Sequence, residues 1–466
     1  MSEMACFRHL SSGVMILGCR MLAPNKAFAV PNGFWLSTRG KEFMTHDRGL
    51  RSSGAPLLVI IVAVVSTLGA WAQNNYKVLY KFTGGADGGF PSASLVLDQA
   101  GNLYGTTTFG GNQGACALSP CGVVFKLAPG SDGRWKESVV YAFCPESTCS
   151  DGGNPYSNVI FDQAGNLYGT TNSGGIGAGV VYKLTRLNHG WKESVLYSFT
   201  GRHDGGNPTT GLIFDSSGDL YGTTGSGGAY QFGTVLKLTP QSRGAWTESV
   251  LYDFTNGDDG GEPTAGVISD SQGNLYGATL TGGKNQVGVI FKLSPAKKGI
   301  WQISVLHSFT GGRDGGFPNA ASLVMDTTGN LYGTTSAGGA YEYGTVFKLT
   351  QSGGKWKETV LHSFANGADG AMPYSTVVFD SAGNLYGTTT QGGDLARCGG
   401  SGCGVVFKLS PNSIGGWKET TLHAFADDPG VEPLAGVILD SAGNLYGTTR
   451  GDGTTTFGSV FEITPY

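Results

Sequence analysis

The chain has 466 residues and a formal net charge of −4, with 39% hydrophobic and 14% charged residues. This composition excludes a disordered chain, and the mild charge gives no electrostatic case for binding nucleic acid or an acidic membrane. Glycine accounts for 79 residues, as expected for an all-β protein with many tight turns, where glycine adopts backbone angles that other residues avoid.

The N-terminal region differs from the rest of the chain. Residues 1–43 show no clear periodicity, whereas Met44 opens a basic segment followed by an apolar run over 55–72 that ends in Ala-Trp-Ala. A basic start, an apolar middle and small residues before a cleavage point are typical of a secretory signal peptide. We therefore expect a doubtful leader over 1–43, with Met44 as the better start, and a signal peptide over 44–72. The alternative is a retained membrane anchor, because about 18 apolar residues can just span a bilayer.

The first predicted strand covers residues 76–82, and a unit of four strand-like pieces follows it repeatedly. The pieces are an apolar run ending in aspartate, Asn-Leu-Tyr-Gly-Thr-Thr, Gly-x-Val-Phe-Lys-Leu and Glu-Ser-Val-Leu-Tyr-Ser-Phe, all rich in β-branched and aromatic residues. The second piece, with its leading glycine, recurs with small changes at Gly101, Gly165, Gly218, Gly273, Gly329, Gly383 and Gly443. A period of this size indicates a solenoid, a propeller or a tandem array.

The turns and the two ends of the repeat array favour a closed propeller. Asp-x-x-Gly-Asn between the first two pieces predicts a tight antiparallel hairpin. The array starts with a lone fourth piece, at 76–82, and ends with the first three pieces, at 436–464. In a closed ring these two incomplete units form one blade, since the N-terminal strand completes the last blade and removes a free edge. The prediction is an all-β, seven-bladed β-propeller of four-stranded antiparallel blades over residues 76–466.

A charge pattern supports pairing of the first strand with the strand at 458–464. Opposite charges facing each other across two antiparallel strands are stabilising. Most third pieces carry lysine and most fourth pieces carry glutamate, whereas at this seam the third piece carries Glu462 and the first strand carries Lys77. Six third pieces carry a lysine: Lys126, Lys183, Lys237, Lys292, Lys348 and Lys408. Five fourth pieces carry a glutamate: Glu137, Glu193, Glu248, Glu358 and Glu419.

Cysteine usage agrees with export. Cys6 and Cys19 lie in the doubtful leader, and the other six cysteines form three close pairs in Gly/Ser/Pro-rich insertions: Cys116/Cys121, Cys144/Cys149 and Cys398/Cys403. An even count in close pairs predicts three local disulfides in an exported chain. The alternative is metal binding, which the spacing disfavours because it is not that of a zinc knuckle and no histidine is close by.

The repeat resembles the GloVer, or choice-of-anchor, tandem repeat of bacterial exported proteins. The resemblance rests on Gly-Asn-Leu-Tyr-Gly-Thr-Thr followed by Gly-Gly and Gly-x-Val-Phe-Lys-Leu, and it covers residues 76–466. More distantly, the Asp-x-x-Gly-Asn-Leu-Tyr core looks like the blades of NHL-type propellers. The resemblance implies export and, often, a C-terminal surface anchor. Here Tyr466 directly follows a strand, so any anchor is expected at the N-terminus, and the family offers no catalytic residues to transfer.

Three repeated features are interpreted as structural. The aspartate of the Asp-Gly-Gly-x-Pro connectors, as in Asp87, could contribute to a calcium site, but its repetition favours a role in the turn itself. His307, His362 and His423 occupy the position of tyrosine in other fourth pieces, which favours outer-strand packing over acid–base catalysis. The tryptophans that open these pieces are better explained by packing between blades than by sugar stacking: Trp135, Trp191, Trp246, Trp301, Trp356 and Trp417.

The loops between the second and third pieces differ most between blades, and such loops on a rigid scaffold are where ligands bind. The candidate ligand-binding residues are Tyr230, Phe232, Tyr341, Tyr343 and Arg397. We expect a non-enzymatic, monomeric binding or scaffold module for a protein or glycan at the cell surface or in the periplasm. Neither nucleic acid nor a membrane contact other than the N-terminal segment is expected.

The alternative is a propeller enzyme of lyase or lactonase type with a metal-assisted site near the central channel. Such a site needs a polar cluster that breaks the repeat symmetry. The non-repeating acidic candidates are Asp258, Glu262, Asp427, Asp428 and Glu432, together with the repeated Asp259. No cofactor is predicted, and calcium is the ion that these carboxylates suit. No Ser-His-Asp pattern is present to suggest a catalytic triad.

Overall fold

The computed structural model describes residues 6–11, 14–19, 75–112, 121–318, 322–426, 430–452 and 456–464. The chain divides into two units, Met1–Leu68 and Gly69–Tyr466. In the first unit, β1 (Cys6–Ser11) and β2 (Val14–Cys19) form an antiparallel hairpin that no sequence pattern had indicated. The predicted signal segment at 44–72 lies outside the described residues. Within those residues, no helix has the length and hydrophobicity needed to cross a membrane.

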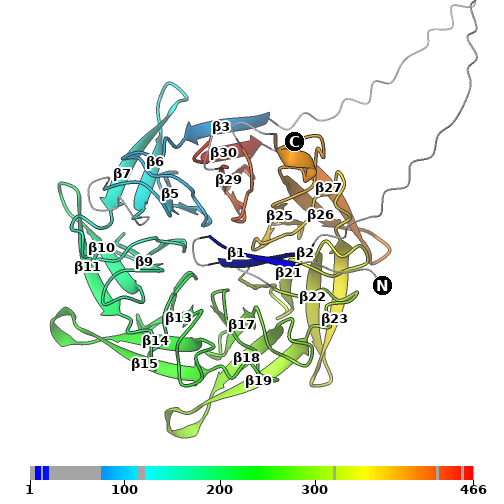
Figure 1. The fold of residues 1–466 in the computed structure, drawn as a ribbon, viewed down its shortest axis with the longest axis horizontal. Coiled ribbons are helices and arrows are strands. Elements are labelled where there is room, and N and C mark those ends of the chain that lie inside the picture. The colour runs from blue at the N-terminus through cyan, green and yellow to red at the C-terminus, as the bar shows by residue number, and fades with distance from the viewer. Residues whose placement is uncertain are drawn as a thin grey trace, which may run out of the picture. The chain divides into compact units, whose positions relative to one another are not determined.

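The second unit is a seven-bladed β-propeller, as predicted, with seven four-stranded antiparallel sheets around a centre (Figure 1). The first strand of each blade is short: β4 (Val96–Leu97), β8 (Ile160–Phe161), β12 (Ile213–Phe214), β16 (Ile268–Ser269), β20 (Val324–Met325), β24 (Val378–Phe379) and β28 (Ile438–Leu439). The second strands carry the Leu-Tyr-Gly-Thr-Thr motif: β5 (Leu103–Thr107), β9 (Leu167–Thr171), β13 (Leu220–Thr224), β17 (Leu275–Thr279), β21 (Leu331–Thr335), β25 (Leu385–Thr389) and β29 (Leu445–Thr449).

The other two strands complete each blade outward. The third strands are β6 (Val123–Pro129), β10 (Val180–Arg186), β14 (Thr234–Pro240), β18 (Val289–Pro295), β22 (Thr345–Ser352), β26 (Val405–Pro411) and β30 (Ser459–Thr464). The outer strands are β7 (Trp135–Ala142), β11 (Trp191–Ser198), β15 (Trp246–Asp253), β19 (Trp301–Ser308), β23 (Lys355–Ser363), β27 (Trp417–Ala424) and β3 (Asn75–Lys81). Three short 3-10 turns lie in the loops: η1 (Ser242–Gly244), η2 (Lys297–Gly299) and η3 (Cys398–Gly400).

The Asp-x-x-Gly-Asn motif forms the hairpin between the first two strands. In the first blade, one Asp98 carboxylate oxygen accepts hydrogen bonds from the backbone amides of Ala100 and Asn102, at 2.9 Å each. The other accepts from the Asn102 side chain at 2.7 Å and from the Tyr104 hydroxyl at 3.3 Å. Gly101 has φ +78°, a conformation that glycine adopts without steric cost. The motif is therefore explained by the turn that it builds.

The glycine of Leu-Tyr-Gly-Thr-Thr makes room for the core of the blade. A Cβ atom on Gly105 would lie 2.5 Å from the Phe125 ring, and one on Gly277 would lie 2.6 Å from the Phe291 ring. The first threonine after this glycine links neighbouring blades, because the Thr106 hydroxyl donates to the Ser157 carbonyl of the next blade at 2.9 Å. The same motif thus serves packing within a blade and attachment between blades.

The tryptophans that open the outer strands pack between blades, as predicted. Trp191 of β11 meets Tyr104 of the preceding blade edge-on, with ring centroids 6.5 Å apart. Trp135 makes the same contact with Tyr446 of the last blade, at 6.0 Å. These rings therefore belong to the interfaces between blades, whose buried aromatic and aliphatic side chains supply most of the stabilisation of such a fold.

The N-terminal strand closes the ring, as predicted. Strand β3 pairs antiparallel with β30, with Tyr76 opposite Ile463 and Lys77 opposite Glu462. Beside this seam, the Thr448 hydroxyl donates to the Ala93 carbonyl of the first blade at 3.4 Å. The last sheet, in the order β28-β29-β30-β3, is thus made from both ends of the chain and leaves no blade incomplete.

The expected Lys–Glu pairing within the other blades is wrong. In the first blade Lys126 lies opposite Ser138, whereas Glu137 lies opposite Leu127. Directly opposed residues share one face of the sheet and successive residues alternate, so Lys126 and Glu137 lie on opposite faces. The six lysines instead lie over the tyrosine of the neighbouring second strand, as Lys183 does over Tyr168 at 5.1 Å from the ring centroid, and Lys183 also forms a 3.9 Å ion pair with Asp162. At the seam, where Lys77 does face Glu462, its ammonium group donates to the Gly133 carbonyl at 3.0 Å.

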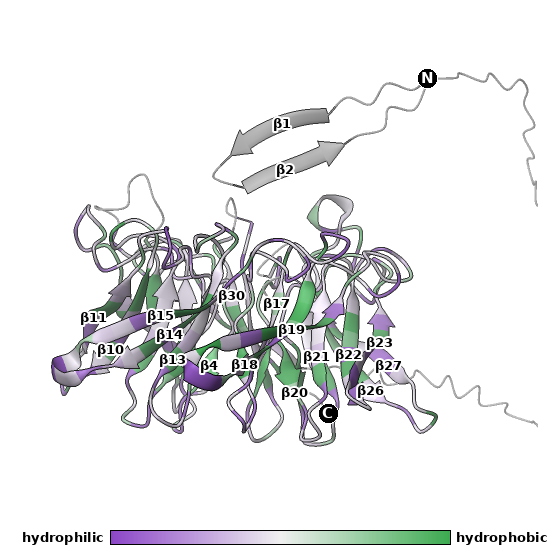
Figure 2. Ribbon diagram, turned by 90° about the horizontal axis from the view of Figure 1, so that it is seen from below, coloured by the Kyte–Doolittle hydropathy of each residue, from purple (hydrophilic) through white to green (hydrophobic). Residues whose placement is uncertain are grey.

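The propeller has two distinct faces. We call upper the face that carries the connectors between blades and the loops between second and third strands, and lower the face with the shorter hairpin turns. Seen edge-on, the strands between the two faces carry most of the hydrophobic residues (Figure 2). The buried residues form clusters between neighbouring blades, such as the one that contains Phe125 and Val460. Ligand-binding residues must therefore be sought on the faces.

Candidate functional site

The predicted aromatic ligand-binding residues lie on the upper face, but only some of them are exposed. The Tyr230 and Tyr341 side chains are each 58% exposed. Phe232 and Tyr343, two residues further along, pack against hydrophobic clusters between blades. Tyr230 and Tyr341 are thus available to a ligand, while Phe232 and Tyr343 anchor the loops that carry them. Arg397 lies in the loop of the sixth blade, where its Nε atom is 3.6 Å from the Asp394 carboxylate.

A second set of upper-face residues was not singled out from the sequence. It is the residue before the connector proline in each blade, and we call this set the pre-proline ring. Every member has a positive φ, between +53° and +59°. The members are Phe90, Asn154, Asn207, Glu262, Phe317, Met372 and Glu432. The backbone therefore repeats seven times, while the side chains differ in size, polarity and charge.

Neighbouring blades fix this backbone conformation. In the fourth blade, the Glu262 amide donates to the Phe232 carbonyl of the preceding blade at 2.8 Å, and the Glu262 carbonyl accepts from the Leu280 amide at 3.0 Å. The fifth blade repeats the arrangement with Phe317, whose amide donates to the Val287 carbonyl at 2.8 Å. Each member thus bridges two blades through its main chain, and the side chain takes no part in that bridge.

The side chains of the ring are poorly suited to this backbone. Positive φ is tolerated by asparagine and glycine, but it is an outlier for bulky residues and costs of order 1–3 kcal/mol. Asparagine occupies the position in the second and third blades. Phe, Glu and Met occupy it in the other five, although asparagine would relieve the strain. The geometry itself therefore does not account for these five side chains.

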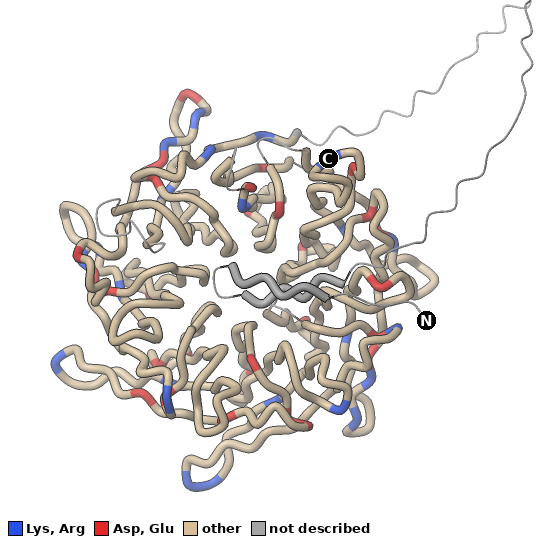
Figure 3. The backbone as a smooth tube through the Cα atoms, in the orientation of Figure 1, with Lys and Arg blue, Asp and Glu red and all other residues tan. Residues whose placement is uncertain are grey.

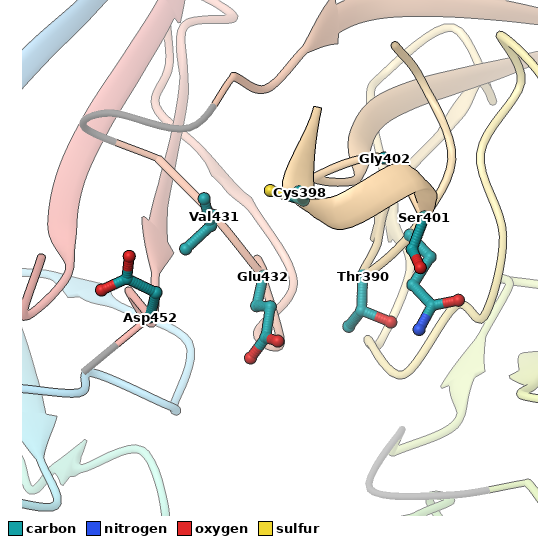
Figure 4. Close-up of a pocket in the computed structure, with 8 residues that line it drawn as sticks. Thr390, Cys398, Ser401, Gly402, Val431, Glu432 and Asp452 are labelled. Atoms are coloured by element: carbon teal, nitrogen blue, oxygen red, sulfur yellow. The ribbon is translucent and has the colours of Figure 1, made fainter. Parts of the chain in front are cut away.

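A pocket of about 330 Å³ opens beside one member of the ring, between the sixth and seventh blades. Figure 4 shows Val431, Glu432 and Asp452 on one side of it, and Thr390 and Ser401 on the other. The Glu432 carboxylate lies 3.4 Å from the Arg450 guanidinium, which in turn lies over the Phe90 ring of the first blade. Through Glu432 and Arg450, the pocket is thus linked to Phe90, the neighbouring member of the ring.

The acidic metal candidates are dispersed around the upper face. Asp259 accepts hydrogen bonds from the Tyr252 hydroxyl and the Thr255 amide, at 2.9 Å each, while Asp258 beside it is exposed. Glu262 and Glu432 belong to different blades, the fourth and the seventh. Asp427 and Asp428 lie outside the described residues. Among the described residues, the group of His, Cys, Asp or Glu side chains close enough to share a metal ion is Cys121, Cys144 and Cys149.

The Asp-Gly-Gly aspartates and the outer-strand histidines form one repeated arrangement. The Asp87 carboxylate accepts from the Tyr80 hydroxyl and the Thr83 amide, at 2.9 Å each. On the outer strand of the fourth blade, His307 replaces the tyrosine and its Nε2 atom lies 3.1 Å from Asp314. Burial lowers the pKa of His307, against the opposing effect of Asp314. These residues are structural, as predicted, because they hold the start of each connector against the outer strand.

Two of the three predicted disulfides are present in the described residues, Cys144–Cys149 and Cys398–Cys403. Cys121 is also disulfide-bonded, and its predicted partner Cys116 lies outside the described residues. The sequence did not predict that Cys121 would lie beside the second pair, with all three Sγ atoms within 4.8 Å of one another. Because β6 and β7 of the first blade pair antiparallel, the segments before β6 and after β7 meet at a cysteine-rich contact.

Charged residues of both signs are mixed around the described propeller (Figure 3). Lys and Arg alternate with Asp and Glu around the propeller, and many of the cations lie at the ends of the outer hairpins (Figure 3). Specific recognition on the upper face must then depend on its aromatic, amide and carboxylate side chains rather than on long-range attraction.

Solved structures share only a distant likeness with the chain. A solved structure from a Thermus species, described as an oxidoreductase (glucose dehydrogenase), has 15% identity and a TM-score of 0.42, covering 84% of this chain and 100% of that one. One from Bacteroides uniformis, described as a 6-phosphogluconolactonase, has 14% identity and a TM-score of 0.45, covering 71% and 84%. Likenesses this distant carry no argument about activity.

Sequence comparison is more informative about the family. No curated protein sequence matched the chain. The model of the Gloeobacter/Verrucomicrobia repeat matches residues 118–328 and 301–466, which together span most of the propeller. The resemblance noted in the repeat motif is therefore confirmed, and the chain belongs to the Gloeobacter/Verrucomicrobia repeat family.

Proposed function

We propose that this chain is an exported, non-enzymatic binding protein that holds a protein or glycan on the upper face of its propeller. The observation that carries the proposal is the pre-proline ring. Five of its seven members have a side chain that its positive φ disfavours. Residues held in unfavourable conformations cluster at ligand clamps and active sites, where the side chain matters more than the strain.

The contrast between repeated and variable positions supports the same conclusion. The repeated residues are engaged in turns, in packing or in bonds between blades, as Asp98, Gly105 and Thr106 illustrate. The positions that differ between blades gather on the upper face, in the ring and in the loops beside it. A rigid scaffold with variable residues on one face is typical of a binding protein.

Substitutions to asparagine test the proposal without damaging the fold. Glu262→Asn and Phe317→Asn each introduce the residue that the second and third blades already carry. We expect both variants to melt at or slightly above the temperature of the unmodified protein, because asparagine tolerates positive φ. We expect both to lose binding on arrays of glycans and of purified cell-surface proteins. This combination separates recognition from stability.

The lower face provides the control. Ile414 is 91% exposed in a lower-face hairpin, so Ile414→Asn should leave binding and melting unchanged. Retained binding by both ring variants, or equal loss with Ile414→Asn, contradicts the proposal. Nothing in the described residues favours the lyase or lactonase alternative, since Asp259 and Glu432 are engaged by Tyr252 and Arg450.

Export is the part of the proposal that rests on sequence and cysteine chemistry. The disulfides agree with an oxidising compartment outside the cytoplasm. We expect cleavage after Ala72, so that the mature chain begins at Gln73. N-terminal sequencing of protein secreted by a bacterial host decides this, and a mature chain that still carries residues 55–72 identifies an anchor instead.

A further inference from the structure

Three consecutive blades present the same upper-face loop. The loops at 226–233, 281–288 and 337–344 have equal lengths and place one residue at the same point of each turn. We call these three residues the Tyr–Asn–Tyr arc: Tyr230, Asn285 and Tyr341. The residue that follows each of them has a positive φ, +68° in Gln231, +60° in Gln286 and +69° in Glu342. The same turn conformation therefore recurs in three neighbouring blades.

Each loop is closed by the same hydrogen bonds. The Gly233 amide donates to the Gly227 carbonyl at 2.9 Å, and the Gly344 amide donates to the Gly338 carbonyl at 2.9 Å. The start of each loop is tied to the end of its own outer strand, since the Ala229 amide donates to Asp253 at 2.7 Å. Loops fixed in this way present their tips without losing further conformational freedom on binding.

Tyr230 and Tyr341 are equivalent in exposure and in their position within the loop, as well as in sequence. Both side chains are 58% exposed, and both sit one residue before a positive-φ position and two before an inward-packed aromatic ring. Between them lies the fourth blade, whose loop offers the exposed polar residues Lys284 and Asn285. A ligand that engages both tyrosines must itself present two like surfaces, separated by a segment that can accept polar contacts.

We propose that the Tyr–Asn–Tyr arc binds an uncharged linear polysaccharide, whose sugar rings lie on Tyr230 and Tyr341 while the units between them contact the fourth blade. This deepens the proposed function and rests on it. Sugar rings are the repeating units that fit best, because each offers an apolar face to an aromatic ring and hydroxyl groups to neighbouring polar residues. Lys and Arg are interspersed with Asp and Glu around the described propeller (Figure 3), which agrees with an uncharged chain as the ligand.

A proline-rich peptide is the other repeating ligand that stacks on aromatic side chains. Such peptides lie in grooves lined by aromatic residues, whereas the tip of the fourth-blade loop, between the two tyrosines, is polar and exposed. The polysaccharide is therefore the occupant that the arc favours, and an oligoproline peptide becomes an arm of the test.

The experiment measures binding of cello-, xylo-, malto- and chito-oligosaccharides of increasing length to the mature propeller. We expect affinity for one series to rise steeply once the oligosaccharide reaches both tyrosines, because the second contact becomes intramolecular. Tyr230→Ala and Tyr341→Ala should each weaken binding of the long chain roughly 10-fold or more and abolish its length dependence. Tyr230→Phe and Tyr341→Phe should keep most of the affinity, because they keep the ring.

Ile176→Ala is the matched control, since Ile176 is 67% exposed in the corresponding loop of the second blade but lies outside the arc. Unchanged binding by both alanine variants overturns the inference, as does equal loss with Ile176→Ala. Binding of oligoproline in place of every sugar series also overturns it. If ligands depend on Glu262 and Phe317 but not on the tyrosines, the proposed function stands and the arc alone fails.

Discussion

Tyr76 of β3 stacks on His423 of β27, with ring centroids 3.8 Å apart and ring planes 8° from parallel. Tyr76 opposes Ile463 in the seam, as Glu137 opposes Leu127 in the first blade. An aromatic ring thus stands where five other outer strands carry glutamate. Burial lowers the pKa of His423 to about 4, so its ring is neutral near pH 7. The stack attaches the N-terminal strand to the sixth blade as well as to the seventh.

Removal of this ring should weaken the closure of the propeller. Tyr76→Ala is expected to cost about 2–3 kcal/mol of unfolding free energy, somewhat less than truncation of a fully buried aromatic side chain. Tyr76→Phe keeps the stack and should cost much less. Thermal and denaturant unfolding measure both variants, and equal melting temperatures for Tyr76→Ala and the unmodified protein would contradict the role given to the stack.

Deletion of the whole strand should have a larger effect. A chain lacking residues 76–82 leaves β30 as an exposed edge, because β3 is its outer partner. We expect a sharp fall in melting temperature and a tendency to aggregate, both visible in a thermal scan with light scattering. Addition of a synthetic peptide of residues 74–83 should partly restore the melting temperature. A truncated chain that melts like the full one would refute closure by β3.

Five partly buried glutamates predict a distinctive dependence of stability on pH. Burial and a nearby aspartate raise the pKa of Glu193 to about 7, and the other four are raised similarly: Glu137, Glu248, Glu358 and Glu419. A carboxyl group with a raised pKa favours the folded state fully below its unfolded pKa, and this contribution is lost as the pH rises through about 7. Each glutamate should therefore destabilise the fold more at pH 8 than at pH 5.

Glu193→Gln isolates this effect from the other titrating groups. Relative to the unmodified protein, the variant should gain stability as the pH rises from 5 to 8, because glutamine stays uncharged. The difference in melting temperature between the two proteins, measured at each pH, is the readout. Lys192→Gln, at the exposed neighbouring position, should show no comparable trend. If the difference in melting temperature did not change with pH, Glu193 would not be held in its protonated form in the folded protein.

The motif glycines offer a test of packing with an internal control. In Gly277→Ala, the new methyl group would lie 2.6 Å from the Phe291 ring, so overpacking should cost about 1–3 kcal/mol. In Gly222→Ala, the nearest atom is the Leu212 Cδ2 at 2.9 Å, the end of a flexible side chain. Denaturant unfolding should therefore show a smaller loss for Gly222→Ala. Equal losses would mean that the aromatic ring is not the reason for the glycine.

The disulfide Cys398–Cys403 should contribute only modestly to stability. A cross-link that closes so short a loop restricts the unfolded chain little, by about 2 kcal/mol in the chain-entropy estimate. The Cys398→Ser/Cys403→Ser variant should therefore keep the far-ultraviolet circular dichroism of the propeller and melt a few degrees lower. Peptide mapping of the unmodified protein should find this pair intact, and a bridge to any other cysteine would contradict the pairing.

The architecture was predictable because local chemistry specifies each repeat. The Asp98 turn and the strand after it need only neighbouring residues, and the leftover strands at the two ends imply closure. The pre-proline ring was not predictable in the same way. Phe317 and Met372 rarely adopt positive φ, and the hydrogen bonds that hold them there come from other blades. Local sequence carries no signal of such a constraint.

The proximity of Cys121 to the second cysteine pair was also not predicted from the sequence. Cys121 lies just before β6 and Cys144 just after β7, and the antiparallel pairing of these two strands in the first blade brings their sulfur atoms together. The direction of Lys126 was misjudged for a related reason, because the cross-strand register decides which face a side chain occupies. Both errors concern three-dimensional placement, whereas the identity of the repeated elements was correct.

The seam between β3 and β30 also constrains the order of events during synthesis. The first strand of the propeller has its partner in the last propeller strand, β30, so six blades can form while the seventh has to wait. Throughout elongation, β3 must remain unpaired and protected from other strands. The ring can therefore close only after β30 has been made, and a chain terminated before β30 cannot complete the seventh blade.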